Sequence, residues 1–216
     1  MKTALLTVLL SLVSLCCLAQ TQVEKIIDVT DQSRLAPDLP FADEIRISTW
    51  DRHKVQVQVA VTINDGEEDN IFALNTQKSS HTISVEMDKD KWKDISWQGM
   101  CQCKSTKISY RVYLPDSMQV TARTISGSYL LDYYGRPLEL KTVSGDIDMS
   151  VPAGRGFDFK VKTVSGEVYS DLTIDYPDGK DGLKQLVGIN VHGRAFGGGP
   201  FADIKTISGN VYLRNK

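Results

Sequence analysis

Apolar and polar residues alternate with a period of two along much of the chain after residue 20. In the C-terminal half, short alternating runs lie on both sides of a recurring Thr-Ile/Val-Ser-Gly unit. Alternation with this period indicates strands that bury one face. The units are Thr124–Gly127, Thr142–Gly145, Thr163–Gly166 and Thr206–Gly209.

The phase of the alternation changes at the same place in every unit. Before the first unit the apolar positions are Val120 and Ala122, and after it they are Tyr129 and Leu131. A shift of one residue moves every later side chain to the opposite face of a strand. The repeated shift therefore predicts a corner at each unit. The Ile or Val and the Gly of each unit are in phase with the apolar residues that follow. They are therefore expected to point inward.

A strand, a corner and a second strand, repeated about every 20 residues, are typical of a β-solenoid, in which stacked copies bury a common core. The glycines are 18, 21 and 43 residues apart, so a degenerate coil or a loop is expected between the third and fourth units. We therefore predict an all-β fold in which residues 116–216 form regular, β-helix-like repeats. An antiparallel β-sandwich is the alternative.

Residues 20–115 are also rich in alternating runs, and no long segment has helical periodicity. We expect this part to continue the same sheets irregularly, within one domain. The Gly-rich stretch Gly193–Pro200 is expected to be a loop before the last coil. The alternating runs of the N-terminal half are Glu44–Ile47, Val55–Val61, His81–Met87 and Ile108–Leu114.

Residues 1–19 have the features of a secretory signal peptide. The apolar run Ala4–Leu18 is too short for a stable membrane span, and Cys17 and Ala19 place small residues before a cleavage after Ala19. A lipoprotein signal is the alternative, but neither Cys16 nor Cys17 follows a Gly, Ala or Ser. Because no other apolar stretch is long enough, the mature chain is expected to have no transmembrane segment.

The charge and the cysteines limit the classes of function. Without residues 1–19 the chain keeps 24 of its 25 Lys and Arg residues and all 27 Asp and Glu residues, a net charge near −3. This balance argues against nucleic-acid binding. Cys101 and Cys103 are expected to form a strained local disulfide or to remain thiols, because they lack the spacing of a redox motif and further metal ligands. We expect no metal and no cofactor.

The repeated units resemble those of a bacterial putative-adhesin domain family of unknown function. Lys141–Ile147, Lys162–Val168 and Lys205–Val211 are similar to its Thr-x-Ser-Gly-Asp/Glu-Ile/Val repeats, and Leu114–Asp116 is similar to the start of its first repeat. The resemblance covers most of the mature chain and is strongest over residues 110–216. It implies an exported, right-handed β-solenoid with no established activity.

A basic residue lies four positions before each glycine. In a solenoid these residues form a ladder with rungs about 4.8 Å apart. It is either a stripe for an acidic partner, such as an anionic glycan, or a solvated edge that discourages edge-to-edge pairing. Tyr169 and Tyr212 could stack on sugar rings, with Tyr133 and Tyr134 extending that surface, or could be cross-strand packing. The basic residues are Arg123, Lys141, Lys162 and Lys205.

The Ser-Gly pairs of the units are expected to be structural, because a serine nucleophile needs its own base and oxyanion hole. A polysaccharide lyase or hydrolase is a remote alternative, in which Asp146, Asp148 and Glu167 face outward near Lys162. The pairs are Ser126 and Gly127, Ser144 and Gly145, Ser165 and Gly166, and Ser208 and Gly209.

The favoured interpretation is an exported, non-enzymatic protein that presents an adhesin-like interaction surface at the cell envelope. Its location is either the periplasm or the cell surface. The partner is a glycan or an envelope protein. The alternative is a periplasmic sensor or scaffold.

Overall fold

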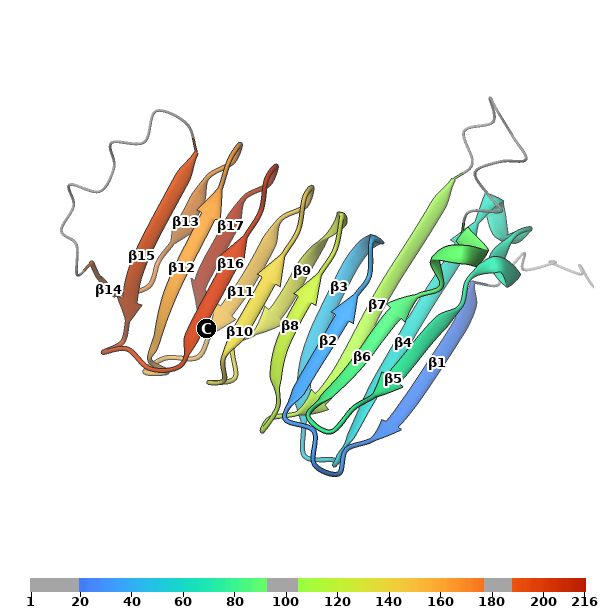
Figure 1. Ribbon diagram of the computed structural model, residues 1–216. Coiled ribbons are helices and arrows are strands. Elements are labelled where there is room, and N and C mark those ends of the chain that lie inside the picture. Colours follow the sequence, from blue (N-terminus) through green and yellow to red (C-terminus); the bar gives the residue numbers. More distant parts are fainter. Residues whose placement is uncertain (1–19, 93–104, 177–187) are drawn as a thin grey trace, which may run out of the picture.

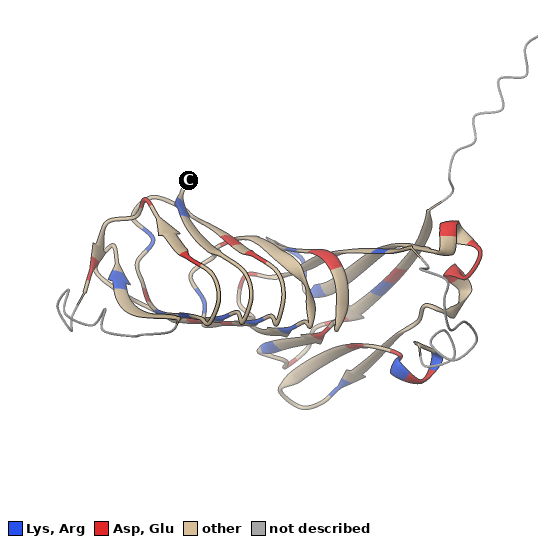
Figure 2. Cartoon of the chain, turned by 90° about the horizontal axis from the view of Figure 1, so that it is seen from above, with Lys and Arg blue, Asp and Glu red and all other residues tan. Residues whose placement is uncertain are grey.

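The computed structural model describes residues 20–92, 105–176 and 188–216. These residues form an all-β structure of two mixed sheets, which lie face to face as two layers (Figures 1 and 2). Two short 3-10 turns, η1 (Asn64–Gly66) and η2 (Asp69–Ile71), follow one of the longer strands. The all-β prediction is confirmed.

Sheet A has eight strands. In spatial order they are β1 (Thr21–Asp28), β4 (Lys54–Ile63), β7 (Thr106–Pro115), β3 (Phe41–Trp50), β9 (Ser126–Asp132), β11 (Ile147–Val151), β17 (Val211–Asn215) and β13 (Val168–Ser170).

Sheet B has nine strands. In spatial order they are β14 (Ile174–Asp175), β15 (Ile189–Ala195), β12 (Phe157–Thr163), β16 (Phe201–Lys205), β10 (Leu138–Lys141), β8 (Gln119–Arg123), β2 (Arg34–Asp38), β6 (Thr82–Met87) and β5 (Leu74–Lys78).

Each Thr-Ile/Val-Ser-Gly unit lies where the chain passes from sheet B to sheet A. It joins β8 to β9, β10 to β11, β12 to β13 and β16 to β17, and in each sheet the strands of the four units pair with one another in parallel. The change of strand at each unit is thus as predicted. The described residues form no closed solenoid, however, because antiparallel strands extend each sheet separately. These are β4 and β1 in sheet A, and β5, β15 and β14 in sheet B. The layers are therefore sandwich-like but mixed, unlike the antiparallel alternative.

The order of the units in space differs from their order in the chain. β16 pairs with both β10 and β12, and β17 pairs with both β11 and β13. The last unit therefore lies between the second and the third. Of the two alternatives for the segment before it, a degenerate coil or a loop, the described residues form neither a regular coil nor a loop throughout, because β14 and β15 extend sheet B beyond β12. The predicted Gly193–Pro200 loop is also shorter, since Gly193 is buried in β15.

Buried threonines join neighbouring units. A hydroxyl buried without a partner costs roughly 1 to 3 kcal/mol, and here each threonine donates a hydrogen bond to a main-chain carbonyl. In the first unit, Thr124 Oγ1 donates to Leu39 O at 2.6 Å. In the other three it donates to a glycine of the adjacent unit: Thr142 to Gly127 at 3.5 Å, Thr206 to Gly145 at 3.3 Å and Thr163 to Gly209 at 3.2 Å.

The glycines are required by the close approach of these units. A Cβ on Gly145 would lie 2.1 Å from the carbonyl oxygen of Gly127, and one on Gly209 would lie 2.1 Å from that of Gly145. For Gly166 the corresponding distance to the oxygen of Gly209 is 2.0 Å. No side chain fits at these distances, so only glycine allows the units to stack at the spacing of a sheet.

The core lies between the two sheets and contains the alternating apolar residues on either side of the units. Val120, Leu140, Tyr129 and Met149 are examples, each no more than 1% exposed. The Ile or Val inside each unit does not belong to this core. The prediction that it points inward is wrong, because the buried threonine takes the inward position at the turn. The exposed residues are Ile125 (51%), Val143 (42%), Ile207 (50%) and Val164 (44%).

We predict that Gly145→Ala lowers the free energy of unfolding by more than about 3 kcal/mol, because the new methyl group must displace buried backbone. Gly197→Ala is the control, since Gly197 also has a positive φ of 86° but open space around its Cβ position. The control is expected to cost about 1 to 2 kcal/mol, from backbone strain alone. Urea unfolding of both variants measures the difference. Equal losses of unfolding free energy would contradict the claim that close contact between the units requires glycine at this position.

Candidate functional site: a basic and aliphatic rim

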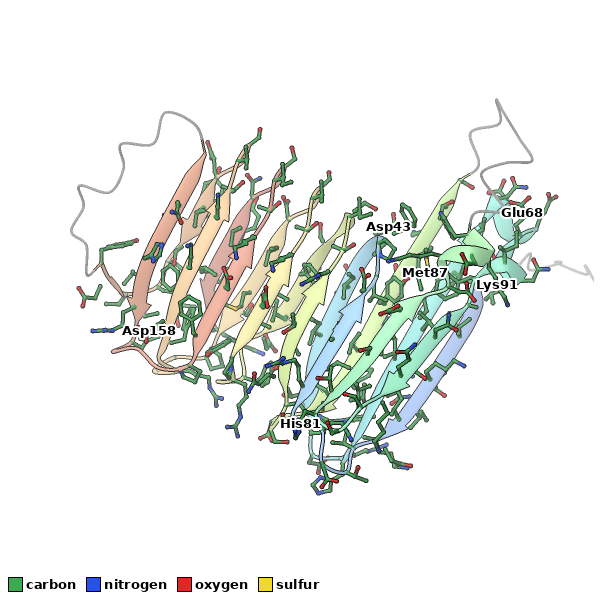
Figure 3. All side chains as sticks on the ribbon, viewed as in Figure 1. Asp43, Glu68, His81, Met87, Lys91 and Asp158 are labelled. Carbon is green, nitrogen blue, oxygen red and sulfur yellow. The ribbon has the colours of Figure 1, made fainter. Side chains whose placement is uncertain are left out.

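The four units lie side by side along one edge of the sandwich. We call this edge the rim and define it as residues 123–127, 141–145, 205–209 and 162–166, in spatial order. Figure 2 views the molecule from above and shows the turns between the two layers following one another along it. Figure 3 labels Asp158 at the opposite end of β12 from the rim.

The rim brings all four predicted basic residues together. In sheet B, Arg123 is in register with Lys141, Lys141 with Lys205, and Lys205 with Lys162. They therefore occupy consecutive rungs, about 4.8 Å apart. Lys162 and Lys205 are neighbours even though they are far apart in the sequence, because β16 lies between β10 and β12. We call these four residues the basic row.

The charge of the basic row is partly compensated. Lys141 forms an ion pair with Glu139 on its own strand, and Lys205 Nζ lies 2.6 Å from Asp203 Oδ2. Arg123 and Lys162 are exposed, and neither side chain forms an ion pair or hydrogen bond within the described ranges. Asp38 is in register with Arg123, but its carboxylate pairs with Lys89 at 3.0 Å. The uncompensated positive charges thus lie at the two ends of the row.

A row of exposed aliphatic side chains runs parallel to the basic row. It contains Ile125, Val143, Ile207 and Val164, each two residues after a member of the basic row, and we call it the aliphatic row. A groove of about 630 Å³ is lined by both rows, by the threonines Thr124, Thr142 and Thr206, and by Asp38. The aliphatic row was not expected from the sequence, because the phase of the alternation assigns its positions to the core. Their regular spacing, two residues after each base, was the signal that could have revealed it.

The predicted structural serines follow the aliphatic row. Ser126 bridges to Ser144, Ser144 to Ser208, and Ser208 to Ser165, all in parallel. These contacts are made by the main chain, and the glycine after each serine is the one that meets the next unit. The Ser-Gly pairs therefore contribute to the stacking of the units. Among the described residues, no base is placed to activate one of these serines.

The acidic residues of the enzyme hypothesis are engaged in contacts on the sheet A side of the rim. Asp146 Oδ1 accepts a hydrogen bond from the main-chain N–H of Asn210 at 2.7 Å. The carboxylate oxygens of Asp148 lie 2.9 and 3.0 Å from Arg214 Nε, and Glu167 Oε2 accepts a hydrogen bond from the hydroxyl group of Tyr169. Lys162 lies in sheet B. The three acids and this lysine therefore do not converge on a common reacting point.

Tyr169 and Tyr212 are stacked on neighbouring strands of sheet A. Their ring centroids are 5.3 Å apart at an interplanar angle of 9°, and the Arg214 guanidinium lies 4.7 Å from the Tyr212 centroid. The hydrogen bond to Glu167 raises the pKa of Tyr169 above its ordinary value. The prediction that Tyr133 and Tyr134 extend this surface is wrong, because both are buried. Sugar binding by Tyr169 and Tyr212 stays a prediction.

Two predictions fall on residues outside the described ones: the signal peptide over 1–19 and the state of Cys101 and Cys103. In the described ranges, no three His, Cys, Asp or Glu side chains cluster in a way that could hold a metal ion. No helix there has the length and apolar content needed to cross a membrane.

No protein-family model and no curated protein matches the chain. Among solved structures, the crystal structure of a putative cell adhesion protein from Clostridium sporogenes has a TM-score of 0.56 at 10% identity, covering 91% of this chain and all of that one. A putative adhesin from Bacteroides fragilis matches with a TM-score of 0.26 at 9% identity, over 92% of this chain and 98% of that one. The first similarity shows that the chain shares the fold of the Clostridium sporogenes protein.

Proposed function

We propose that this chain is an exported, non-enzymatic, adhesin-like protein that presents the rim to an acidic partner at the cell envelope. The observation that carries the proposal is the register of Arg123, Lys141, Lys205 and Lys162 on consecutive rungs of one sheet. Lys141 and Lys205 are paired with Glu139 and Asp203, whereas the positive charges of Arg123 and Lys162 at the two ends of the row are left for a negatively charged partner. The mature chain has a net negative charge, so the row is a local exception to its surroundings.

We infer further that residues 20–115 and 116–216 form one domain, with the parallel units as a short right-handed solenoid segment. The support is that β2 and β3 pair with β8 and β9, so strands from both halves share both sheets. An anionic glycan and an acidic envelope protein are examples of such an acidic partner. A periplasmic sensor or scaffold would use the same rim and is the second candidate.

The basic row predicts charge-dependent binding. Arg123→Glu combined with Lys162→Glu is expected to weaken binding to immobilised polygalacturonate by at least about tenfold at low salt, since it reverses the two uncompensated charges. The control is Lys25→Glu combined with Lys107→Glu, which changes the net charge equally at exposed positions on β1 and β7. Melting temperatures should be unchanged in both. Equal weakening by the two pairs, or none, would contradict a role of the rim.

Export predicts where the protein is found in the cells that produce it. Protease treatment of intact cells should remove it if it lies on the cell surface. In the periplasm, it should become sensitive only when the outer membrane is broken. In both cases the mature chain should begin near Gln20. Recovery from the cytosol with residues 1–19 attached would contradict export.

A further inference from the structure

The two rows of the rim together indicate the class of acidic partner. We propose that the rim docks onto an anionic lipid surface, with the aliphatic row entering the headgroup region and the basic row meeting the headgroup phosphates. The inference rests on the proposed function, because it takes the partner to be acidic, and it adds the chemistry of that partner.

The aliphatic row is a contiguous apolar strip on the protein surface. Single exposed apolar side chains are ordinary on protein surfaces, but contiguous ones mark interaction sites. Eight large hydrophobic residues are exposed in the described parts of the chain, and four of them occupy the consecutive rungs of the rim. All four are β-branched and between 42% and 51% exposed. Half of the exposed apolar residues are thus concentrated in one line.

The uncompensated charge of the basic row is confined to its two ends. Because Lys141 and Lys205 are engaged with Glu139 and Asp203, a hydrophilic polyanion would meet two uncompensated cations, Arg123 and Lys162. These lie three rungs apart, or roughly 14 Å. The aliphatic row is unbroken over the same rungs, but its side chains can form no ion pair or hydrogen bond with such a polymer. An anionic amphiphile can use both rows.

The rim is a narrow surface. A stable protein interface usually takes about 20 to 30 residues from each partner, which is more than the rim offers, because its four threonines are buried. Shallow insertion into a lipid surface needs only a narrow apolar strip with cations beside it, buried roughly 5 to 10 Å deep. Figure 1 shows the rim at the ends of β8, β10, β16 and β12, where a flat surface can reach all four rungs.

The flanking residues define the orientation. On the sheet A side, the position after each glycine carries Ser128, Asp146, Asn210 or Glu167, so negative charge lies there. On the sheet B side lies the basic row. An anionic surface therefore attracts the sheet B side of the rim and repels the sheet A side. We expect the protein to bind such a surface with the sheet B side of the rim closer to it.

Vesicle binding by the purified protein tests the proposal. The protein should float with phosphatidylglycerol vesicles and remain unbound with phosphatidylcholine vesicles. Val143→Thr combined with Ile207→Thr should weaken binding to the anionic vesicles by about tenfold or more. These changes keep the β-branched shape and affect exposed atoms, so the melting temperature should hold. Ile26→Thr is the matched control, because Ile26 is 55% exposed on β1, away from the rim, and should have no effect.

The outcomes separate this inference from the proposed function. Binding to polygalacturonate but not to anionic vesicles would overturn the lipid proposal and leave the acidic partner in place. Vesicle binding that is lost in Arg123→Glu/Lys162→Glu but unchanged in Val143→Thr/Ile207→Thr would also overturn it, because adsorption would then depend on charge alone. Binding to neither probe would overturn both.

Discussion

The close stacking of glycine against glycine at the corners is the constraint on which the rest of the structure depends. At each corner the chain passes from sheet B to sheet A, and in three of the four units the glycine there faces the carbonyl oxygen of a glycine in the adjacent unit. A buried threonine hydroxyl donates to that carbonyl in three of the four units. The two requirements, no Cβ at one position and an inward hydroxyl three residues earlier, account for the Thr and Gly of the repeated sequence.

The same constraint creates the rim. When the corners stack in register, every outward position of one unit aligns with the same position of the next. A basic residue before each corner becomes a basic row, and a β-branched residue within each corner becomes an aliphatic row. The ion pairs of Lys141 and Lys205 lower the repulsion inside the basic row while leaving its ends charged. The proposed interaction surface is therefore a consequence of the repeat.

Sequence reasoning predicted the strands beside the units, the change of strand at each corner and the ladder of bases, because these depend on local periodicity. It placed Ile125 and its equivalents inward because phase alone cannot show which residue of a turn is buried. A β-solenoid would also stack its units in chain order. The insertion of β16 and β17 between earlier strands, and the antiparallel pairing of β15, depend on contacts between distant segments that no local pattern encodes.

The order of the units along the stack is the central claim, and disulfide pairing tests it most directly. In a background of Cys101→Ser and Cys103→Ser, the pair Ser144→Cys and Ser208→Cys should crosslink on mild oxidation, because these positions are bridged in neighbouring units. The pair Ser144→Cys and Ser165→Cys should not, because the last unit separates them by two rungs, roughly 10 Å. Crosslinking of the second pair and not the first would show that the units stack in chain order, and would contradict this account.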